Sequence, residues 1–86
     1  MKFRKKPVII DAEQFTGDKA QALRLGLRYS TAAMGGMAWF APTLEGEMIV
    51  NVGAWVIRGV KGEIYPCADD IFKLTYEPVA PSKLHY

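Results

Sequence analysis

Cysteine and histidine are nearly absent from this 86-residue sequence, which contains one residue of each type, Cys67 and His85. A lone cysteine cannot form an internal disulfide, and it cannot build a zinc site of the common cysteine-based kind. We therefore expect no metal ion and no cofactor. The lack of a disulfide framework is typical of the cytoplasm, where thiols stay reduced.

Long apolar runs are also missing. No stretch approaches the roughly 18 consecutive apolar residues that a membrane-spanning helix needs. The apolar run that follows the basic N-terminus covers only residues 7–10 and is broken by Asp11. We therefore expect neither a membrane segment nor an export signal, and we expect the protein to act in the cytoplasm.

The composition is otherwise that of a small folded domain. Half of the residues are hydrophobic and 23% are charged, which is enough apolar material for one core. We predict a single β-rich domain over residues 1–80 and a flexible tail over 81–86. Because a core of this size contributes little net stability, burial between subunits would help, and we expect a homo-oligomer.

Alternating polarity, turn glycines and helix-capping residues define the expected elements. They are a strand over 7–15, a helix over 18–25, a hairpin of strands 39–44 and 47–52, a hairpin of strands 54–58 and 63–65 that ends at Pro66, a single helical turn over 71–73 capped by Asp69 or Asp70, and an extended segment over 74–79. Residues 27–36 show neither the helical nor the strand periodicity of apolar residues. The sequence therefore predicts an α+β fold, with one short helix and a strongly curved antiparallel sheet or partial barrel of about five strands.

Two parts of the sequence carry motifs of a known group. The first is the basic opening with its proline and hydrophobic strand, residues 1–12. The second holds Gly53-Ala54-Trp55, the stretch Gly-Val-Lys-Gly-Glu-Ile-Tyr-Pro-Cys at 59–67, and an ending with Asp-Ile-Phe at 70–72 and Thr-Tyr-Glu at 75–77. Over 1–16 and 43–79 the chain resembles small uncharacterised phage and prophage proteins. The resemblance implies a phage origin and a compact β-rich fold, but no activity. That group usually has an acidic residue where this chain has Ala54.

Groups that could act in catalysis are few. His85 lies in the expected flexible tail, where it could not serve as a positioned base. Cys67 lies close to Asp69 and Asp70, which would raise its thiol pKa and make it less reactive. Those two carboxylates and Glu63 lack the spacing of a cation-binding loop. We expect no catalytic residue and no metal site, and a small hydrolase that uses Glu63 or Asp70 is the least favoured function.

The second hairpin carries the candidate binding residues. Trp55 and Tyr65 lie on its two arms, close to Arg58 and Glu63. An aromatic surface with charged neighbours is typical of a small-ligand or protein-binding face. In the competing interpretation most of the four strand aromatics, Trp39, Phe40, Trp55 and Tyr65, belong to the core.

The basic N-terminal segment suggests a different ligand. It contains four of the eleven basic residues together with an aromatic ring, in the order Lys2, Phe3, Arg4, Lys5 and Lys6. Such a segment could follow phosphates while the ring stacks on a base, as in proteins that bind single-stranded nucleic acid. The rest of the chain contains seven basic and nine acidic residues, so it is mildly acidic. A basic segment before a strand also serves to prevent pairing between sheets.

These expectations favour a non-enzymatic, phage-encoded binding module in the host cytoplasm. It would inhibit host defence by occupying a host protein or by sequestering a small signalling molecule. The alternative is a single-stranded nucleic-acid-binding protein that uses residues 2–6. Salt would separate the two, because contacts with phosphates weaken steeply as salt rises.

Overall fold

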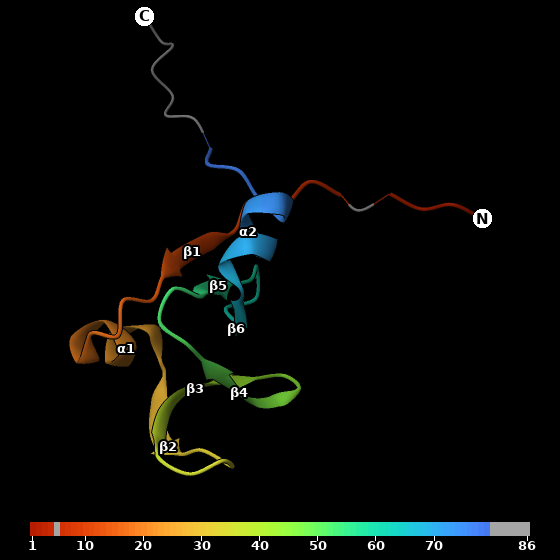
Figure 1. The fold of residues 1–86 in the computed structure, drawn as a ribbon. Helices are drawn as coiled ribbons and strands as arrows, with labels where there is room; N and C mark the ends of the chain where they lie inside the picture. Colours follow the sequence, from red (N-terminus) through yellow and green to blue (C-terminus); the bar gives the residue numbers. More distant parts are fainter. Residues whose placement is uncertain (5, 80–86) are drawn as a thin grey trace, which may run out of the picture.

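The computed structural model describes residues 1–4 and 6–79, which form six strands and two helices (Figure 1). In chain order they are β1 (Asp11–Gln14), α1 (Lys19–Leu25), β2 (Arg28–Thr31), β3 (Met37–Thr43), β4 (Gly46–Val50), β5 (Trp55–Arg58), β6 (Ile64–Cys67) and α2 (Asp69–Thr75). No helix among the described residues is long and apolar enough to cross a membrane. Lys5, His85 and the tail expected over 81–86 lie outside the described residues.

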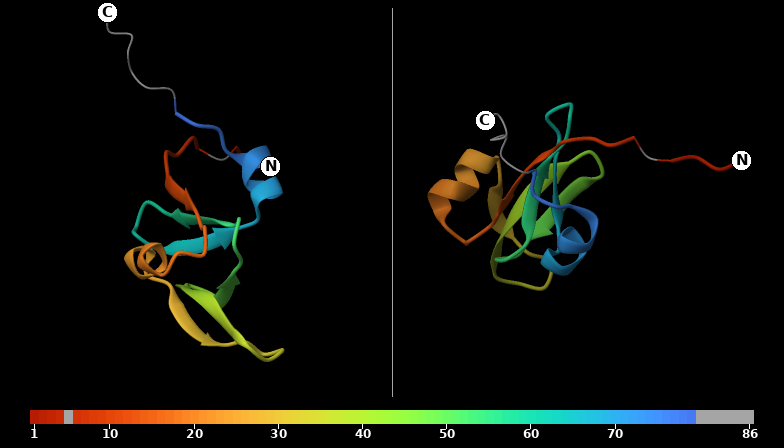
Figure 2. Two further views of the ribbon diagram at one scale, coloured as in Figure 1. Left: turned by 60° about the vertical axis from the view of Figure 1, so that its left-hand side comes forward. Right: turned by 90° about the horizontal axis from the view of Figure 1, so that it is seen from above.

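The strands form two three-stranded sheets, with the orders β1–β5–β6 and β2–β3–β4. Every strand pairing in the described part of the chain is antiparallel. The predicted small α+β architecture is therefore confirmed. The strands number six rather than about five, and across residues 1–4 and 6–79 they close no barrel but stay in two separate sheets (Figures 1 and 2).

The central strand β5 is buried on both faces. Val56 and Ile57 are neighbours in sequence, so their side chains point to opposite faces of the sheet, and they are only 3% and 1% exposed. Val56 belongs to the main core cluster, which also contains Phe15, Ala22, Leu25, Leu27, Ala41, Val50 and Ile64. Ile57 shares its face with Trp55, whose ring stacks on Phe72 of α2. The β1–β5–β6 sheet is thus a middle layer, with α2 on one face and the main cluster on the other.

Helix α1 forms where the sequence predicts a helix. The Asp18 side chain caps it by accepting a hydrogen bond of 2.9 Å from the backbone N–H of Gln21. Gly26 ends it in the left-handed conformation, with φ of +88°. Ala22 and Leu25 are buried, which anchors the apolar side of the helix in the core.

The first strand is shorter than predicted. It was expected over 7–15, but β1 begins at Asp11, which pairs with Arg58, the last residue of β5. The chain turns at Gly59 directly afterwards, so residues 7–10 have no strand opposite them. A strand pattern without a partner cannot form a ladder, and the segment up to Ile9 stays exposed.

Residues 27–36, where the sequence shows no hydrophobic periodicity, contain a strand. β2 pairs with β3 along its whole length, from Arg28 with Phe40 to Thr31 with Met37. All four β2 residues are exposed, so neither face imposes an apolar alternation on the sequence. This is the physical reason why the pattern over 27–36 predicts nothing there.

The first hairpin is confirmed, with its turn shifted by one residue. Leu44 and Glu45 form the turn, and Gly46 pairs with Thr43 as the first residue of β4. Gly46 has φ of +105°, a conformation that side chains rarely adopt. The Thr43 hydroxyl donates a hydrogen bond of 2.6 Å to the Gly46 carbonyl and accepts one of 3.1 Å from the Glu45 N–H.

The second hairpin is also confirmed, but its strand does not end at Pro66. β6 continues to Cys67, and Pro66 pairs with Val56. β6 is an edge strand, and a proline is tolerated there because no neighbour needs its missing N–H.

The last helix is longer than the predicted single turn. α2 covers Asp69–Thr75, so its last two residues are helical where an extended segment was predicted. Its N-cap is Ala68, without a side-chain cap, whereas a cap by Asp69 or Asp70 was predicted. Packing against the sheet through Phe72 supports the helix in place of a cap.

Replacement of Gly46 by valine tests the hairpin turn. A β-branched residue at φ of +105° is strained, and we expect the free energy of unfolding to fall by about 1–3 kcal/mol. Urea denaturation followed by circular dichroism would measure the change. The control is Glu45→Val, because positive φ among the described residues occurs only at glycines. Equal denaturation midpoints for the two variants would show that the turn does not need the glycine.

Candidate functional site

Two surface hollows lie against α1. The larger, of about 710 Å³, is formed by α1, the start of β2 and β3. The smaller, of about 280 Å³, lies between α1 and the β1–β5–β6 sheet. Only the larger has a volume in the middle of the range of about 300–1,000 Å³ that is common for small-molecule sites.

An aromatic pair forms one wall of the larger hollow. Tyr29 and Trp39 are cross-strand partners, and their ring centroids lie 4.8 Å apart with an interplanar angle of 47°. Trp39 also meets the buried Phe15 edge to face at 6.4 Å, which fixes the indole from the core side. Tyr29 is 57% exposed and Leu23, on α1, is 59% exposed. The hollow therefore offers a held aromatic surface that is open to solvent.

The charge in the larger hollow is of one sign. Its lining residues are Gly17, Lys19, Leu23, Leu27, Arg28, Tyr29 and Trp39, which include two cations and no acid. Arg28 makes one ion-pair contact of 3.1 Å, from Nη1 to the Glu47 carboxylate. Arg28 and Glu47 lie on the face of the β2–β3–β4 sheet opposite Tyr29 and Trp39, because side chains alternate along a strand. Lys19 is therefore the lining cation available beside the rings, and a planar group with a negative charge matches this combination.

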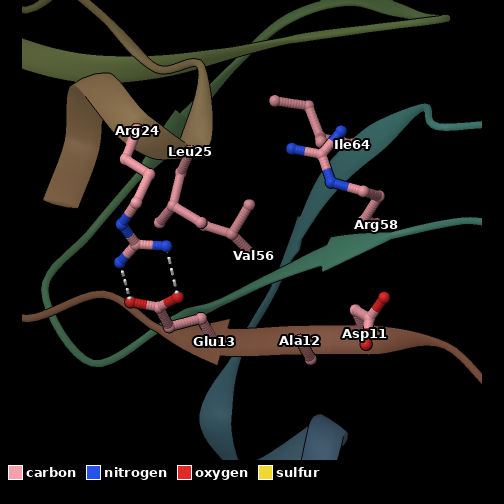
Figure 3. Close-up of a pocket in the computed structure, with 8 residues that line it drawn as sticks. All are labelled: Asp11, Ala12, Glu13, Arg24, Leu25, Val56, Arg58 and Ile64. Carbon is pink, nitrogen blue, oxygen red and sulfur yellow. Dashed lines mark hydrogen bonds and ion pairs between the residues drawn. The ribbon is translucent and has the colours of Figure 1, made fainter.

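The smaller hollow has mixed charge. Leu25, Val56 and Ile64 form its apolar floor, and two acids and two arginines surround it (Figure 3). The two terminal nitrogens of the Arg24 guanidinium donate to the two carboxylate oxygens of Glu13, with 3.0 Å between Nη1 and Oε1. Gln21 adds a hydrogen bond of 2.8 Å to the same carboxylate. These contacts lower the pKa of Glu13 from 4.5 to about 2. The hydrogen bond from Arg24 lowers the pKa more than the one from Gln21 does. Glu13 and Arg24 are thus paired with each other, so the central charges of this hollow are already used within the fold.

The four residues predicted as a binding face are not brought together. Trp55 and Tyr65 lie on the face of the sheet that α2 covers, whereas Arg58 lies on the opposite face and lines the smaller hollow. The Arg58 guanidinium donates to the Gly62 carbonyl at 3.1 Å. The Glu63 carboxylate accepts a hydrogen bond of 2.9 Å from the Lys61 N–H. Both charged groups serve the hairpin turn rather than a shared surface.

Trp55 is held by α2. Its ring stacks on Phe72 with centroids 4.1 Å apart and planes within 5°. Its indole N–H donates to Asp69 at 2.8 Å, and this bond, followed by the one from Lys73, lowers the pKa of that carboxyl. The half-buried Tyr65 has a raised pKa, chiefly because of burial. Both rings are therefore half-buried on the face of the sheet that α2 covers.

The acidic residues and the cysteine form no cluster. Among the residues that the structure describes, no group of three or more cysteine, histidine, aspartate or glutamate side chains could hold a metal ion. Burial raises the pKa of the Cys67 thiol, and the charge of Asp70 raises it further. A raised pKa leaves the thiol protonated and poorly nucleophilic near neutral pH.

The basic N-terminal segment extends away from the domain (Figures 1 and 2). Lys2, Phe3, Arg4 and Lys6 are all exposed, and Phe3 retains 87% of its accessible surface. These residues are available to a ligand, but they do not line either hollow.

Sequence reasoning missed the larger hollow. Its residues come from α1, β2 and β3, and β2 has no periodicity that could be recognised. The signal that was present is Tyr29, the one large ring among the four residues of β2.

The low pKa of Glu13 predicts a pH dependence of stability. Because the pKa is lower in the folded protein, the Arg24 contact stabilises the fold above pH 4.5, and this stabilisation is lost as the pH falls toward about 2. Thermal unfolding at a series of pH values should show a smaller loss over this window in Glu13→Gln than in the unmodified protein. Glu45→Gln, at an exposed turn position, is the control. Parallel pH profiles for Glu13→Gln and the unmodified protein would contradict the prediction.

Trp55 can be tested by two substitutions. Loss of the ring in Trp55→Ala should lower the free energy of unfolding by about 2–4 kcal/mol, because the indole is half-buried and stacked. Trp55→Phe keeps a ring on Phe72 and should cost less than about 1.5 kcal/mol. Chemical denaturation measures both. If Trp55→Ala unfolds at the same denaturant concentration as the unmodified protein, Trp55 is a surface residue after all.

No protein-family model matches the chain, and neither a curated protein nor a solved structure matches it. Its function has therefore to be inferred from its own residues.

Proposed function

We propose that this protein is a non-enzymatic, phage-encoded binding module that acts in the host cytoplasm by sequestering a small planar anion, such as a nucleotide-like signalling molecule. The observation that carries the proposal is the larger hollow, where the aromatic pair Tyr29 and Trp39 and the cation Lys19 line the same surface. The phage origin rests on the resemblance of residues 1–16 and 43–79 to small phage and prophage proteins.

The hollow supplies the two interactions that such a ligand needs. Stacking of a base on an aromatic side chain is worth about 1–3 kcal/mol, and the rings are already in place because Phe15 supports Trp39. A held ring loses little conformational entropy when the ligand binds. Lys19, which lines the same hollow, would then pair with a phosphate or carboxylate oxygen.

One specific observation favours single-stranded nucleic acid as the second candidate. Phe3 is 87% exposed among the basic residues Lys2, Arg4 and Lys6. An extended strand could engage this segment by its phosphates and by stacking. Its affinity would fall steeply with salt, in proportion to the number of phosphates neutralised. A small anion that contacts the single cation Lys19 would show a shallower dependence.

The indole of Trp39 provides the test. In a Trp55→Phe background Trp39 is the one remaining tryptophan, so its fluorescence reports on the larger hollow. We expect quenching on addition of ATP or GTP, and we expect Tyr29→Ala and Lys19→Ala each to weaken binding by about tenfold, because each removes an interaction of roughly 1–2 kcal/mol. Native mass spectrometry of the protein purified from bacterial lysate should show a nucleotide-sized adduct.

Two control variants separate the hollow from general effects. Lys61→Ala removes an exposed cation from the β5–β6 turn, and Ile71→Ala removes an exposed apolar side chain from α2. Both should bind as the background protein does. Unchanged Trp39 fluorescence with each nucleotide, together with a bare protein in the mass spectrum, would reject the proposed ligand class. Quenching by single-stranded oligonucleotides alone, with a steep salt dependence, would favour the second candidate.

A further inference from the structure

The four sheet edges differ in how they prevent pairing with another chain. β1 carries two carboxylates, β6 carries a proline, and β2 carries an arginine with serine and threonine beside the exposed Tyr29, whose ring packs on Trp39. Charges and prolines are the usual means by which edge strands avoid association. β4 instead exposes Met48 and Ile49, which are 41% and 46% exposed on opposite faces. Its one charged residue, Glu47, is engaged by Arg28.

The register of the hairpin shows which backbone groups of β4 point outward. Pro42 pairs with Glu47, and this pair cannot exchange hydrogen bonds because proline has no N–H. Hydrogen-bonded and non-hydrogen-bonded pairs alternate along an antiparallel ladder. Ile49 is two residues further along and therefore points the same way as Glu47. The N–H and C=O groups of both residues face away from β3, and in the described part of the chain no other backbone group bonds to them.

We propose that β4 pairs antiparallel with β4 of a second copy, about a two-fold axis at Met48. Glu47 of each copy then exchanges backbone hydrogen bonds with Ile49 of the other, and the two Met48 side chains meet at the axis. The two β2–β3–β4 sheets become one continuous sheet. The interface is isologous, so it closes as a dimer and does not propagate into a fibre.

A second copy fits this edge because β4 is complementary to itself. A two-fold axis at Glu47 would place two carboxylates opposite each other, which is unfavourable. An axis at Ile49 would pair Glu47 with Asn51, beyond the end of the strand at Val50. The register at Met48 avoids both, and it places every residue of β4 opposite a β4 residue of the other copy, from Gly46 with Val50 to Met48 with Met48.

The dimer leaves the larger hollow open. The hollow lies at the β2 edge of the sheet and β4 forms the opposite edge, so the dimer does not depend on the proposed ligand. Pairing of five-residue strands buries less than about 1,200 Å², the range of weak complexes. We expect a monomer–dimer equilibrium in the micromolar range.

Sedimentation velocity of the full chain over a concentration series tests the association. We expect the weight-average mass to rise from monomer to dimer and no further. A protein that remains monomeric at the highest soluble concentration, or one that forms larger species, would overturn the proposal.

Cross-linking tests the register. In a Cys67→Ala background, Met48→Cys should form an intermolecular disulfide, because paired Cα atoms at a non-hydrogen-bonded position lie about 4.5 Å apart, within the range a disulfide spans. Thr31→Cys, exposed on the β2 edge, is the control and should not cross-link at the same protein concentration. Equal cross-linking of the two variants would show that β4 is not the interface.

Charge complementation provides a readout that misfolding cannot imitate. Met48→Lys and Met48→Glu should each be monomeric, because like charges meet at the axis, whereas their mixture should recover a dimer. The same pair of substitutions at Thr31 should leave the unmodified equilibrium unchanged. If the Met48 mixture stays monomeric while circular dichroism shows both variants folded, the two-fold axis does not lie at Met48.

Discussion

The burial of β5 on both faces is the constraint on which the rest of the structure depends. Val56 and Ile57 point in opposite directions and are both excluded from solvent. A sheet with two apolar faces needs two covers. Helix α2 supplies one, and α1 with the inner face of the second sheet supplies the other.

The second sheet is the part that this arrangement leaves incomplete. Its inner face carries the buried Ala41 and Val50, but in the described part of the chain its edge strands β2 and β4 pair with no further strand. Tyr29 at one edge and Met48 with Ile49 at the other remain exposed, and their further burial would stabilise the protein. Both proposed interactions are therefore located on this sheet, and neither uses the sheet that organises the core.

What the sequence predicted correctly was set by local chemistry. Asp18 and Gly26 fix the two ends of α1 without help from distant residues, and the turn glycines do the same for the hairpins. The length of β1 and the existence of β2 were not predictable in this way, because they depend on where β5 ends and on pairing with β3. The predicted binding face failed for a simpler reason. Trp55 and Arg58 are three residues apart in a strand, and a period of two places them on opposite faces.

The position of Pro42 in the middle strand relates the hydrogen-bonding pattern at one edge of the second sheet to the pattern at the other edge. Because Pro42 cannot donate, the alternation along β3 makes Trp39 a hydrogen-bonded partner of Val50 and hence a non-hydrogen-bonded partner of Tyr29. Side chains lie closest in non-hydrogen-bonded pairs, which agrees with the ring separation of 4.8 Å in the larger hollow. The same alternation turns the backbone of Ile49 outward on β4. One residue without an N–H thus determines both the closeness of the aromatic pair and the hydrogen-bonding groups that the opposite edge presents.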